Sequence, residues 1–352
     1  MKEKKIKVLV LYNEAHPEYY HKSEEPTPDL DFKTYFEFEE LTPMEEFEIM
    51  SKRLQKLGFD AYTLNLKDDI FLLLNEVKKN KPDVIFNFVE IYKDRPRLEM
   101  NVVGLYELLG VPYTGAPALT LANCQNKFLT KKLLNYHGIN TAKFQLFKEF
   151  PDDLSLKVKF PLIVKPAYED ASVGIENESI VTNKELLKKR LDYIFKYFDQ
   201  PALVEEFIVG REFNVSVVGD LKPKVLPISE IDFSKMPDHL HNIVSYQAKW
   251  DPHHESYHKT IPICPAKIPM RLEKKLKETA LKAFKIMGPR DYARVDMRVN
   301  GDEEVFVLEV NPNPDLTEGA GFMRSASYGG LSYGMALKKI VMLAYQRGKR
   351  KK

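Results

Sequence analysis

The sequence predicts an α/β N-terminal domain with a doubly wound parallel sheet, followed by an α+β body. Three observations predict this division. Short apolar runs alternate with segments of helical periodicity from residue 6 to about residue 109. Residues 212–219 alternate between polar and apolar, as an antiparallel strand does. Asn300-Gly301 then separates two runs rich in β-branched residues, which predicts a hairpin.

The N-terminal elements follow one another as strand, helix, strand, helix, strand. The predicted strands are Ile6–Tyr12, Ala61–Leu66 and Asp83–Val89, and the predicted helices between them are Pro43–Leu57 and Ile70–Lys79. This order predicts parallel pairing. Because such sheets bind ligands beyond the carboxyl ends of their strands, Asn87 and Glu90 are candidate site residues. Residues 14–42 break the pattern and are predicted to form a functional loop or a disordered segment.

The rest of the chain is predicted to contain both helices and strands. We expect helices at Leu98–Leu109, Ala122–His137, Asn183–Phe198, Arg271–Met287 and Leu331–Arg347, strands at Phe160–Val164, Ala202–Ile208 and Glu212–Gly219, a long loop at His239–Thr260, and a hairpin over Tyr292–Val310. At roughly 150 residues per domain, 352 residues suggest two or three domains. We place the boundaries at 1–121, 122–208 and 209–352.

Composition excludes several classes of protein. Lys and Arg total 53 against 51 Asp and Glu, so the formal net charge is only +2. This balance argues against a nucleic-acid partner, and the basic ends of the chain are predicted to be solvated. The two cysteines, Cys124 and Cys264, exclude a disulfide framework and a cysteine zinc site. No apolar run approaches the roughly 18 residues of a membrane span, so we expect no membrane partner and a cytoplasmic location.

The first candidate site is a lysine at a strand end followed by a loop of small residues. Lys165 follows the strand 160–164, and the loop continues through Ser172 to Gly174. An ammonium group, loop N–H groups and a hydroxyl together suit a phosphate. The pattern is not a Walker loop, because the lysine precedes the loop. In isolation, a structural turn is the commoner explanation of this pattern.

The second candidate is the strand end Glu205-Glu206-Phe207-Ile208, which leads to Glu212. Backbone groups at such an edge can read an adenine, and a nearby carboxylate can accept hydrogen bonds from ribose hydroxyls. The alternative is that Glu205 and Glu206 simply alternate between the two faces of a strand.

The third candidate is the hairpin, and its pattern is the most specific. Strand periodicity places Arg294 and Asp296 on one face and Glu309 and Asn311 on one face. With a four-residue turn at 300–303, Asp296 would face Val307 and Arg294 would face Glu309, so the four polar side chains would share one side.

Two carboxylates and an amide form the oxygen donor set that Mg²⁺ prefers beside phosphates. An exposed face with a cross-strand Arg–Glu pair is the alternative. The predicted opposite face is apolar, which favours the metal site; it consists of Val295, Met297, Val299, Phe306, Leu308 and Val310. The histidines of residues 239–258 match no zinc spacing, and we predict a solvated polar loop there.

Taken together, the order and spacing of these motifs resemble those of ATP-grasp ligases, most closely the D-alanine–D-alanine ligase family. The matching segments are Gly110–Gly115 (GVPYTG), Asn126-Lys127, Thr130-Lys131, Phe160–Ile175, Leu203–Phe213, Tyr246–Trp250 (YQAKW), Tyr292–Met297 (YARVDM) and Leu308–Pro314 (LEVNPNP). The resemblance implies an ATP-grasp architecture, in which two α+β subdomains follow the N-terminal domain and clasp ATP.

The same resemblance implies roles for individual positions at the nucleotide. Lys127 and Lys165 would hold phosphates, and Ser172 would lie in the covering loop. Glu205 and the backbone of Phe207 and Ile208 would read adenine. Glu212 would bind the ribose.

The resemblance also implies a metal and substrate site. Asp296, Glu309 and Asn311 would hold two Mg²⁺ ions, with Mn²⁺ as a substitute. Arg294 would stabilise the oxyanion that forms when an amine attacks an acyl phosphate, and Lys249 would approach the γ-phosphate as its loop closes. Glu90, Tyr246 and residues near Leu316 would line the pocket for the second substrate.

The implied activity is an ATP- and Mg²⁺-dependent ligase that forms an amide through an acyl phosphate, with peptidoglycan synthesis as the implied role and a homodimer as a common assembly. Several departures concern the substrate side: Phe88-Val89-Glu90-Ile91 replaces a His-Gly, Asp170-Ala171-Ser172 replaces a glycine and two serines, and Pro314–Glu318 lacks a His-Ser. A different amino-acid or peptide pair therefore stays open. A regulatory nucleotide-binding protein without turnover also stays open, although such a protein would not need Arg294.

Overall fold

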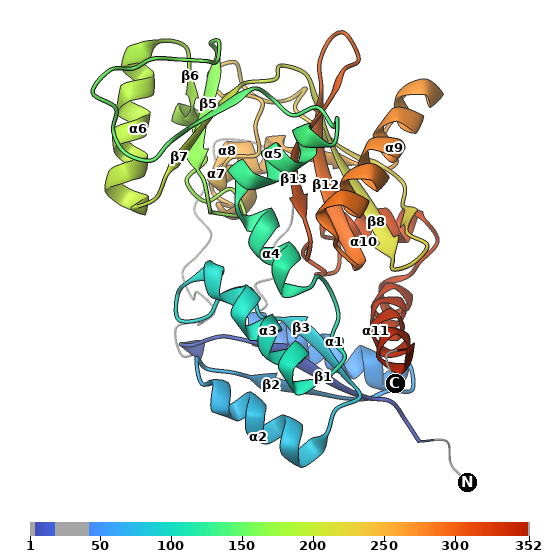
Figure 1. Cartoon of the computed structure of the whole chain (residues 1–352). Helices are drawn as coiled ribbons and strands as arrows, with labels where there is room; N and C mark the ends of the chain where they lie inside the picture. Colours follow the sequence, from blue (N-terminus) through green and yellow to red (C-terminus); the bar gives the residue numbers. More distant parts are fainter. Residues whose placement is uncertain (1–3, 18–41, 351–352) are drawn as a thin grey trace.

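The computed structural model describes residues 4–17 and 42–350, and their strands form three sheets (Figure 1). The predicted loop 14–42 lies mostly outside the described residues. The first sheet has the order β2-β1-β3, and both pairings are parallel, as predicted. Its strands are β1 (Lys7–Tyr12), β2 (Asp60–Asn65) and β3 (Val84–Phe88), connected by the helices α1 (Pro43–Lys56) and α2 (Ile70–Asn80).

The segment that leads from the first sheet to the second is helical. Its helices are α3 (Glu99–Leu109), α4 (Ala118–Gln125) and α5 (Lys127–Tyr136). The single helix predicted over 122–137 is wrong, because the chain leaves helical geometry at Asn126, where ψ is 90°. The Asn126 side chain accepts a hydrogen bond from the N–H of Leu129 and so caps α5. Asparagine favours such caps over helix interiors.

The second sheet is antiparallel and has the order β4-β7-β5-β6. Its elements are β4 (Phe144–Phe147), β5 (Leu162–Pro166), β6 (Ile180–Val181), the helix α6 (Lys184–Phe198) and β7 (Ala202–Glu206). Leu187, Leu191 and Ile194 of α6 are buried with Leu162, Val164 and Val204 of the sheet. The sheet therefore has one face covered, and its other face is available to a site.

The third sheet carries the hairpin and has the order β11-β10-β8-β12-β13, with β9 paired to β8. Its elements are β8 (Arg211–Gly219), β9 (Lys224–Val225), β10 (Ser229–Asp232), β11 (Ile261–Ile263), the helix α9 (Met270–Met287), β12 (Asp291–Val299), β13 (Val305–Asn311) and the helix α10 (Gly321–Tyr328). Strand β8 is antiparallel to β10 and β12, as predicted.

The predicted loop 239–260 contains two short helices, α7 (Tyr246–Trp250) and α8 (Glu255–Lys259). Each has five residues, which is too few to show a helical period in sequence. Side-chain caps stabilise both, since Ser245 accepts a hydrogen bond from the N–H of Ala248 and His254 accepts one from the N–H of Ser256. The prediction of a loop without structure is therefore wrong here.

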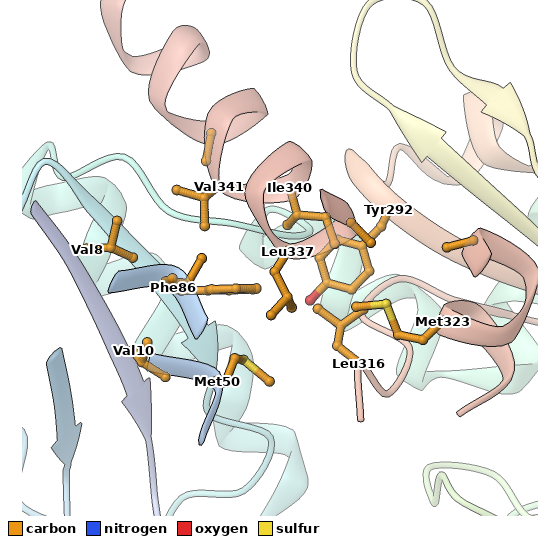
Figure 2. Packing of buried hydrophobic residues seen from close by; sticks show 14 of the residues in the cluster. Val8, Val10, Met50, Phe86, Tyr292, Leu316, Met323, Leu337, Ile340 and Val341 are labelled. Atoms are coloured by element: carbon orange, nitrogen blue, oxygen red, sulfur yellow. The ribbon is translucent and has the colours of Figure 1, made fainter. Parts of the chain in front are cut away.

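The last helix, α11 (Tyr333–Arg350), packs on the first sheet (Figure 2). Leu337, Ile340 and Val341 of α11 share one buried cluster with Val8 and Phe86 of the sheet. The boundaries at 121 and 208 stay predictions, but some of the residues that cover the first sheet come from the far end of the chain. No helix within residues 4–17 and 42–350 is long and apolar enough to cross a membrane.

Candidate active site

The predicted polar face of the hairpin exists, but its register differs from the prediction. Asp296 pairs with Glu309 and Arg294 with Asn311, whereas Met297 pairs with Val307. The turn is one residue longer than predicted, and a bulge at Leu308 adds a second shift. Either change alone would turn the carboxylate of Glu309 to the core side; together they keep all four polar residues on one face.

The apolar face changes with the register. Val305, Val307 and Val310 lie in the core with Val295 and Met297, whereas Phe306 and Leu308 do not, so the prediction for these two residues is wrong. At the bulge, the alternation of β13 side chains between the two faces of the sheet shifts by one residue. This happens because two residues of β13 there lie opposite one residue of β12.

Asp296 accepts hydrogen bonds from three neighbouring side chains. Arg294 donates to it through two nitrogens, at 2.7 and 2.8 Å. Asn214 of β8 donates at 2.7 Å, and Asn311 of β13 donates at 2.8 Å. A buried carboxylate with this set of donors is held in one orientation.

Glu309 lies among cations from distant parts of the chain. The Nζ of Lys127, at the start of α5, is 3.2 Å from Oε2 of Glu309 and 3.3 Å from Oδ1 of Asp170. Burial would raise the pKa of Glu309, but Lys127, Lys165 and Arg294 hold it well below its usual range. The two carboxylates likewise outweigh burial and raise the pKa of Lys127. Glu309 is thus fully ionised at neutral pH.

The residues predicted to bind metal supply a suitable set of oxygen donors. Asn311 Nδ2 lies 2.8 Å from Asp296 Oδ2 and 3.3 Å from Glu309 Oε1, so its amide is between the two carboxylates. A half-turn of the amide would replace this nitrogen with oxygen, giving two carboxylates and a carbonyl. This chemistry fits Mg²⁺ or Mn²⁺. Within the part of the chain that the structure describes, no group of three or more His, Cys, Asp or Glu side chains is arranged to hold a metal ion. The site at the hairpin offers two carboxylates and an asparagine.

A second cluster of charges joins α5 to the second sheet. Glu205 is 1% exposed, and its oxygens are 2.8 Å from Lys131 Nζ and 2.7 Å from Lys165 Nζ. Burial would raise the pKa of Glu205, but the two ammonium groups outweigh it and lower the pKa. Burial lowers the pKa of Lys131. Two lysines on one carboxylate leave one buried positive charge without a carboxylate partner in this cluster, which an anionic ligand would offset.

The loop after Lys165 is bonded to the segment that carries Lys249. The Ser172 hydroxyl donates to the carbonyl of Val244 at 2.8 Å, and Tyr246 N–H donates to the carbonyl of Ile175 at 2.7 Å. Trp250 Nε1 donates to the carbonyl of Ala171 at 2.9 Å. The loop and α7 therefore form one unit, and the hydroxyl of Ser172 is engaged by protein in this state.

Lys249 and Glu90 lie near the polar face of the hairpin. The protein around the ammonium group and the nearby Arg294 lower the pKa of Lys249. Glu90 is exposed to solvent, yet the protein around it limits its hydration and, with Asp315, raises its pKa to about 7. Lys249 and Asp170 also act on the pKa of Glu90, so their charges lie within electrostatic range of this carboxyl.

The other predicted substrate residues differ in their exposure. Tyr246 is 44% exposed, whereas Leu316 is 2% exposed and packs in the cluster shown in Figure 2. Leu316 is therefore part of the core and does not line the predicted substrate pocket. Its neighbour Asp315 is exposed and acts on the pKa of Glu90. Asn87, also named by position, is buried; its amide oxygen accepts a hydrogen bond from Tyr106 at 2.9 Å.

Glu212, predicted to bind ribose, is buried beside Arg298 at a separation of 2.9 Å. Sequence reasoning missed Arg298, and it also missed the contacts of Lys131, Asp170 and Asn214. Strand periodicity could have found Arg298 and Asn214, because both lie on the same face as Asp296 once β8 and β12 are paired. Asp170 and Lys131 had no such signal, since their partners are far away in sequence.

The histidine-rich segment is only partly solvated. His239, His241 and His254 line a cavity of about 270 Å³ with Asn177 and Glu178. His258, however, is 1% exposed, and its ring lies 2.8 Å from the carbonyl of Pro252. The prediction of a solvated loop is wrong for His258, which helps to fix α8.

Comparison with known proteins agrees with this geometry. A family described as D-ala D-ala ligase C-terminus matches residues 131–342. The chain is 32% identical to a D-alanine–D-alanine ligase of Aquifex aeolicus, over 84% of this chain and 91% of the relative. It is also 32% identical to the uncharacterized protein y4sG of Sinorhizobium fredii, over 84% and 85%.

The solved structures that resemble the chain include a D-alanine–D-alanine ligase from Bacillus anthracis complexed with ATP. The TM-score is 0.72 at 23% identity, and the match covers 99% of this chain and 100% of that one, which supports the predicted fold. The family match extends over more than half of the chain, and the identity to curated relatives exceeds 30% over more than two thirds of it. The chain therefore belongs to the D-alanine–D-alanine ligase-like family of ATP-grasp proteins, a family of ATP-dependent ligases.

Proposed function

We propose that the protein is an ATP- and Mg²⁺-dependent ligase that joins a carboxylate to an amine through an acyl phosphate. The observation that carries the proposal is a group of cations beside Glu309: Lys127 lies 3.2 Å from its carboxylate, and Lys165 and Arg294 lower its pKa. Three cations beside oxygen donors match the needs of a triphosphate with its metal, because phosphoryl transfer depends on positioning and charge neutralisation.

The nucleotide would lie between the second and third sheets. Lys127 and Lys165 would bind its phosphates, and the loop around Ser172 would cover them. Within residues 42–350, no backbone carbonyl accepts a hydrogen bond from the N–H of Ile208, which supports a role for this group at the adenine edge. Glu205, held by two lysines, would lie behind the base, and Phe207 would flank it.

Asp296, Glu309 and Asn311 would hold the metal. A divalent cation there supplies charge neutralisation for the transferred phosphoryl group. Arg294 is already oriented by Asp296, so its guanidinium is available to stabilise the oxyanion of the second step without reorganising. Lys249 would approach the γ-phosphate from α7.

Two steps follow from this arrangement. A carboxylate oxygen of the first substrate attacks the γ-phosphorus, the bond to the β–γ bridging oxygen breaks, and ADP leaves. The amine of the second substrate then attacks the carbonyl carbon of the acyl phosphate. The bond from carbon to the phosphate oxygen breaks, the nitrogen loses a proton, and amide and phosphate are released. The loop around Ser172, with α7, would exclude water from the acyl phosphate.

The substrates are small amino acids or peptides. Glu90 and Tyr246, with Asp315 beside the buried Leu316, would form the pocket for the amine. The relatives named as D-alanine–D-alanine ligases make two D-alanines the first pair to test, and peptidoglycan precursor synthesis would follow from that pair. The acidic residues Glu90 and Asp315 support a different amino-acid or peptide pair as the second candidate.

The test is phosphate release from ATP with Mg²⁺ across a panel of D- and L-amino acids, with mass detection of the products. A D-Ala-D-Ala product is expected if D-alanine is used, and another amide would keep the chemistry and change the substrates. If ATP binds and no member of a broad panel gives an amide, the ligase proposal fails and the regulatory alternative gains support.

A further inference from the structure

Arg298 binds three segments of the chain near the predicted nucleotide site, and the proposed function gives it no role. It is 3% exposed and lies directly across from Glu212 in the register of β8 and β12. Its Nε and Nη2 atoms donate to the same oxygen, Oε2 of Glu212, at 3.0 and 2.9 Å. The other carboxylate oxygen, Oε1, receives no hydrogen bond from Arg298.

The same guanidinium binds two further segments. Nη1 donates to the carbonyl of Ile208 at 2.9 Å, and Nη2 donates to the carbonyl of Asn242. The ring of Phe207 lies 4.8 Å from the guanidinium carbon. Arg298 therefore joins β8, the connector 207–210 and the segment that leads into α7. A planar group with five N–H donors can make these contacts at once, and an ammonium group cannot.

These contacts have a consequence for Glu212. Burial raises the pKa of this carboxyl, and Arg298 acts against that rise. Without Arg298, a buried Glu212 would tend to take up a proton and could rotate away from its present position. With Arg298 in place, Oε1 is an oriented acceptor beside the connector.

We propose that Arg298 is a positioning residue of the nucleotide site, which orients Glu212 toward the ribose hydroxyls and ties the connector to the segment that carries Lys249. This inference rests on the proposed function, because it requires that ATP binds between the second and third sheets. It adds that ribose recognition and the position of α7 depend on one side chain.

Trp250 offers a direct measurement of the second part of this inference. It is the only tryptophan in the sequence, and it ends α7. Its Nε1 donates to the carbonyl of Ala171 in the covering loop, and half of its surface is exposed. A change in the position of the loop or of α7 on nucleotide binding should therefore change its fluorescence.

The experiment uses the full chain with Mg²⁺ and compares ATP with 2′-deoxy-ATP and 3′-deoxy-ATP. Nucleotide affinity and the amplitude of the Trp250 fluorescence change are measured for wild type, Arg298→Met, Arg298→Lys and a control, Arg211→Met. Arg211 is a matched control, because it pairs with Glu230 across neighbouring strands of the same sheet, at 2.6 Å, and is exposed.

Arg298→Met should weaken ATP binding by about tenfold or more, the cost expected for losing hydrogen bonds to a charged group. Its preference for ATP over the deoxy nucleotides should fall toward one, because Glu212 is no longer oriented. Arg298→Lys should keep part of that preference and lose most of the fluorescence change. Arg211→Met should match wild type in both measurements.

A double variant separates the two contributions. If Arg298 acts on the ribose through Glu212, then Arg298→Met in a Glu212→Gln background should cause no further loss of ribose preference. Wild-type preference and fluorescence change in Arg298→Lys would overturn the inference and leave the proposed function intact. Absence of ATP binding by the wild-type chain would overturn the proposed function and the inference with it. Should Arg298→Met fail to fold, Arg298→Lys decides the question.

Discussion

Asp296 and Glu309 are direct cross-strand partners, and the bulge at Leu308 puts both carboxylates on the same face of the hairpin. Their separation in sequence is bridged by a short turn within one sheet, so their relative position depends on few other elements. Lys127 reaches this pair from α5, at 3.2 Å from Glu309.

Replacing Glu309 with Gln should lower turnover by more than about 100-fold. Replacing a residue that only supports a metal ligand already lowers metal affinity or activity by about 10- to 100-fold. The fold should persist, because the side chain lies on the open face of β13. Steady-state kinetics and a thermal melt check both points. Glu304→Gln, on the exposed turn of the same hairpin, should behave as wild type; normal activity in Glu309→Gln would remove the metal assignment.

Lys165→Ala should weaken ATP binding by about 10- to 100-fold, the range for hydrogen bonds to charged groups. Glu205 keeps Lys131 as a partner, at 2.8 Å, so the variant should still fold. Equilibrium binding of ATP measures the effect. Lys157→Ala, an exposed lysine of the preceding segment, serves as the control, and equal affinities for the two variants would contradict a phosphate role.

Glu205→Gln should lower the free energy of unfolding by about 3–5 kcal/mol, the range measured when one partner of a buried ion pair is removed. Lys131 and Lys165 would then lie together without a buried carboxylate. Urea denaturation gives the value. Its neighbour in the strand, Glu206, is less buried and accepts a hydrogen bond from the exposed Lys159 N–H, so Glu206→Gln should change stability little. Similar losses of unfolding free energy in both variants would contradict a stabilising role of the ion pairs between Glu205 and the two lysines.

Arg294→Ala should reduce kcat by about 10²- to 10³-fold, as loss of an oxyanion donor does. ATP affinity should stay within about threefold of wild type, because the effect is on the transition state. Asp296 retains Asn214 and Asn311 as donors, which keeps the polar face of the hairpin in place. A loss of affinity equal to the loss of rate would instead assign Arg294 to nucleotide binding. Arg271→Ala, on the exposed side of α9, is the control.

The raised pKa of Glu90 predicts that the KM for the amine substrate depends on pH. This pKa is raised to about 7, so the group is largely neutral below that pH and anionic above it. If the anion binds the substrate ammonium, the KM for the amine should fall as pH rises through about 7. In Glu90→Gln that change should be absent between about pH 6 and about pH 8. An identical pH profile in the variant would exclude Glu90 from the amine site.

Much of the fold could be predicted because β1 is a nearly continuous apolar run, β2 and β3 are short segments rich in apolar residues, and α1 and α2 are periodic. The hairpin could be predicted from the Asn300-Gly301 turn between its two strands. Its polar face could be predicted because Arg294 and Asp296, like Glu309 and Asn311, are two residues apart. The register of the hairpin could not be predicted. Apolar residues in Val305–Asn311 occur on both faces of the strand, so the alternation of the sequence does not show where a bulge lies.

Contacts between distant segments could not be predicted either. The partners of Lys131 and Asp170 depend on how α5 approaches the second and third sheets, and no local pattern encodes that approach. The break at Asn126 was missed because the apolar spacing continues through it, and a cap rests on one side chain. The helices α7 and α8 were missed because five residues show less than two turns of periodicity.

The packing of α11 on the first sheet sets an order of events during synthesis. Val8 and Phe86 leave the ribosome long before Leu337 and Ile340, which share their buried cluster. Met50 and Leu54 of α1 can pack on this face of the sheet early, but the part that α11 covers stays open until nearly all of the remaining chain has been made. The first sheet is the first to be translated and among the last to be completed, so nascent chains that stall before residue 337 would present part of its apolar face to chaperones and to other chains.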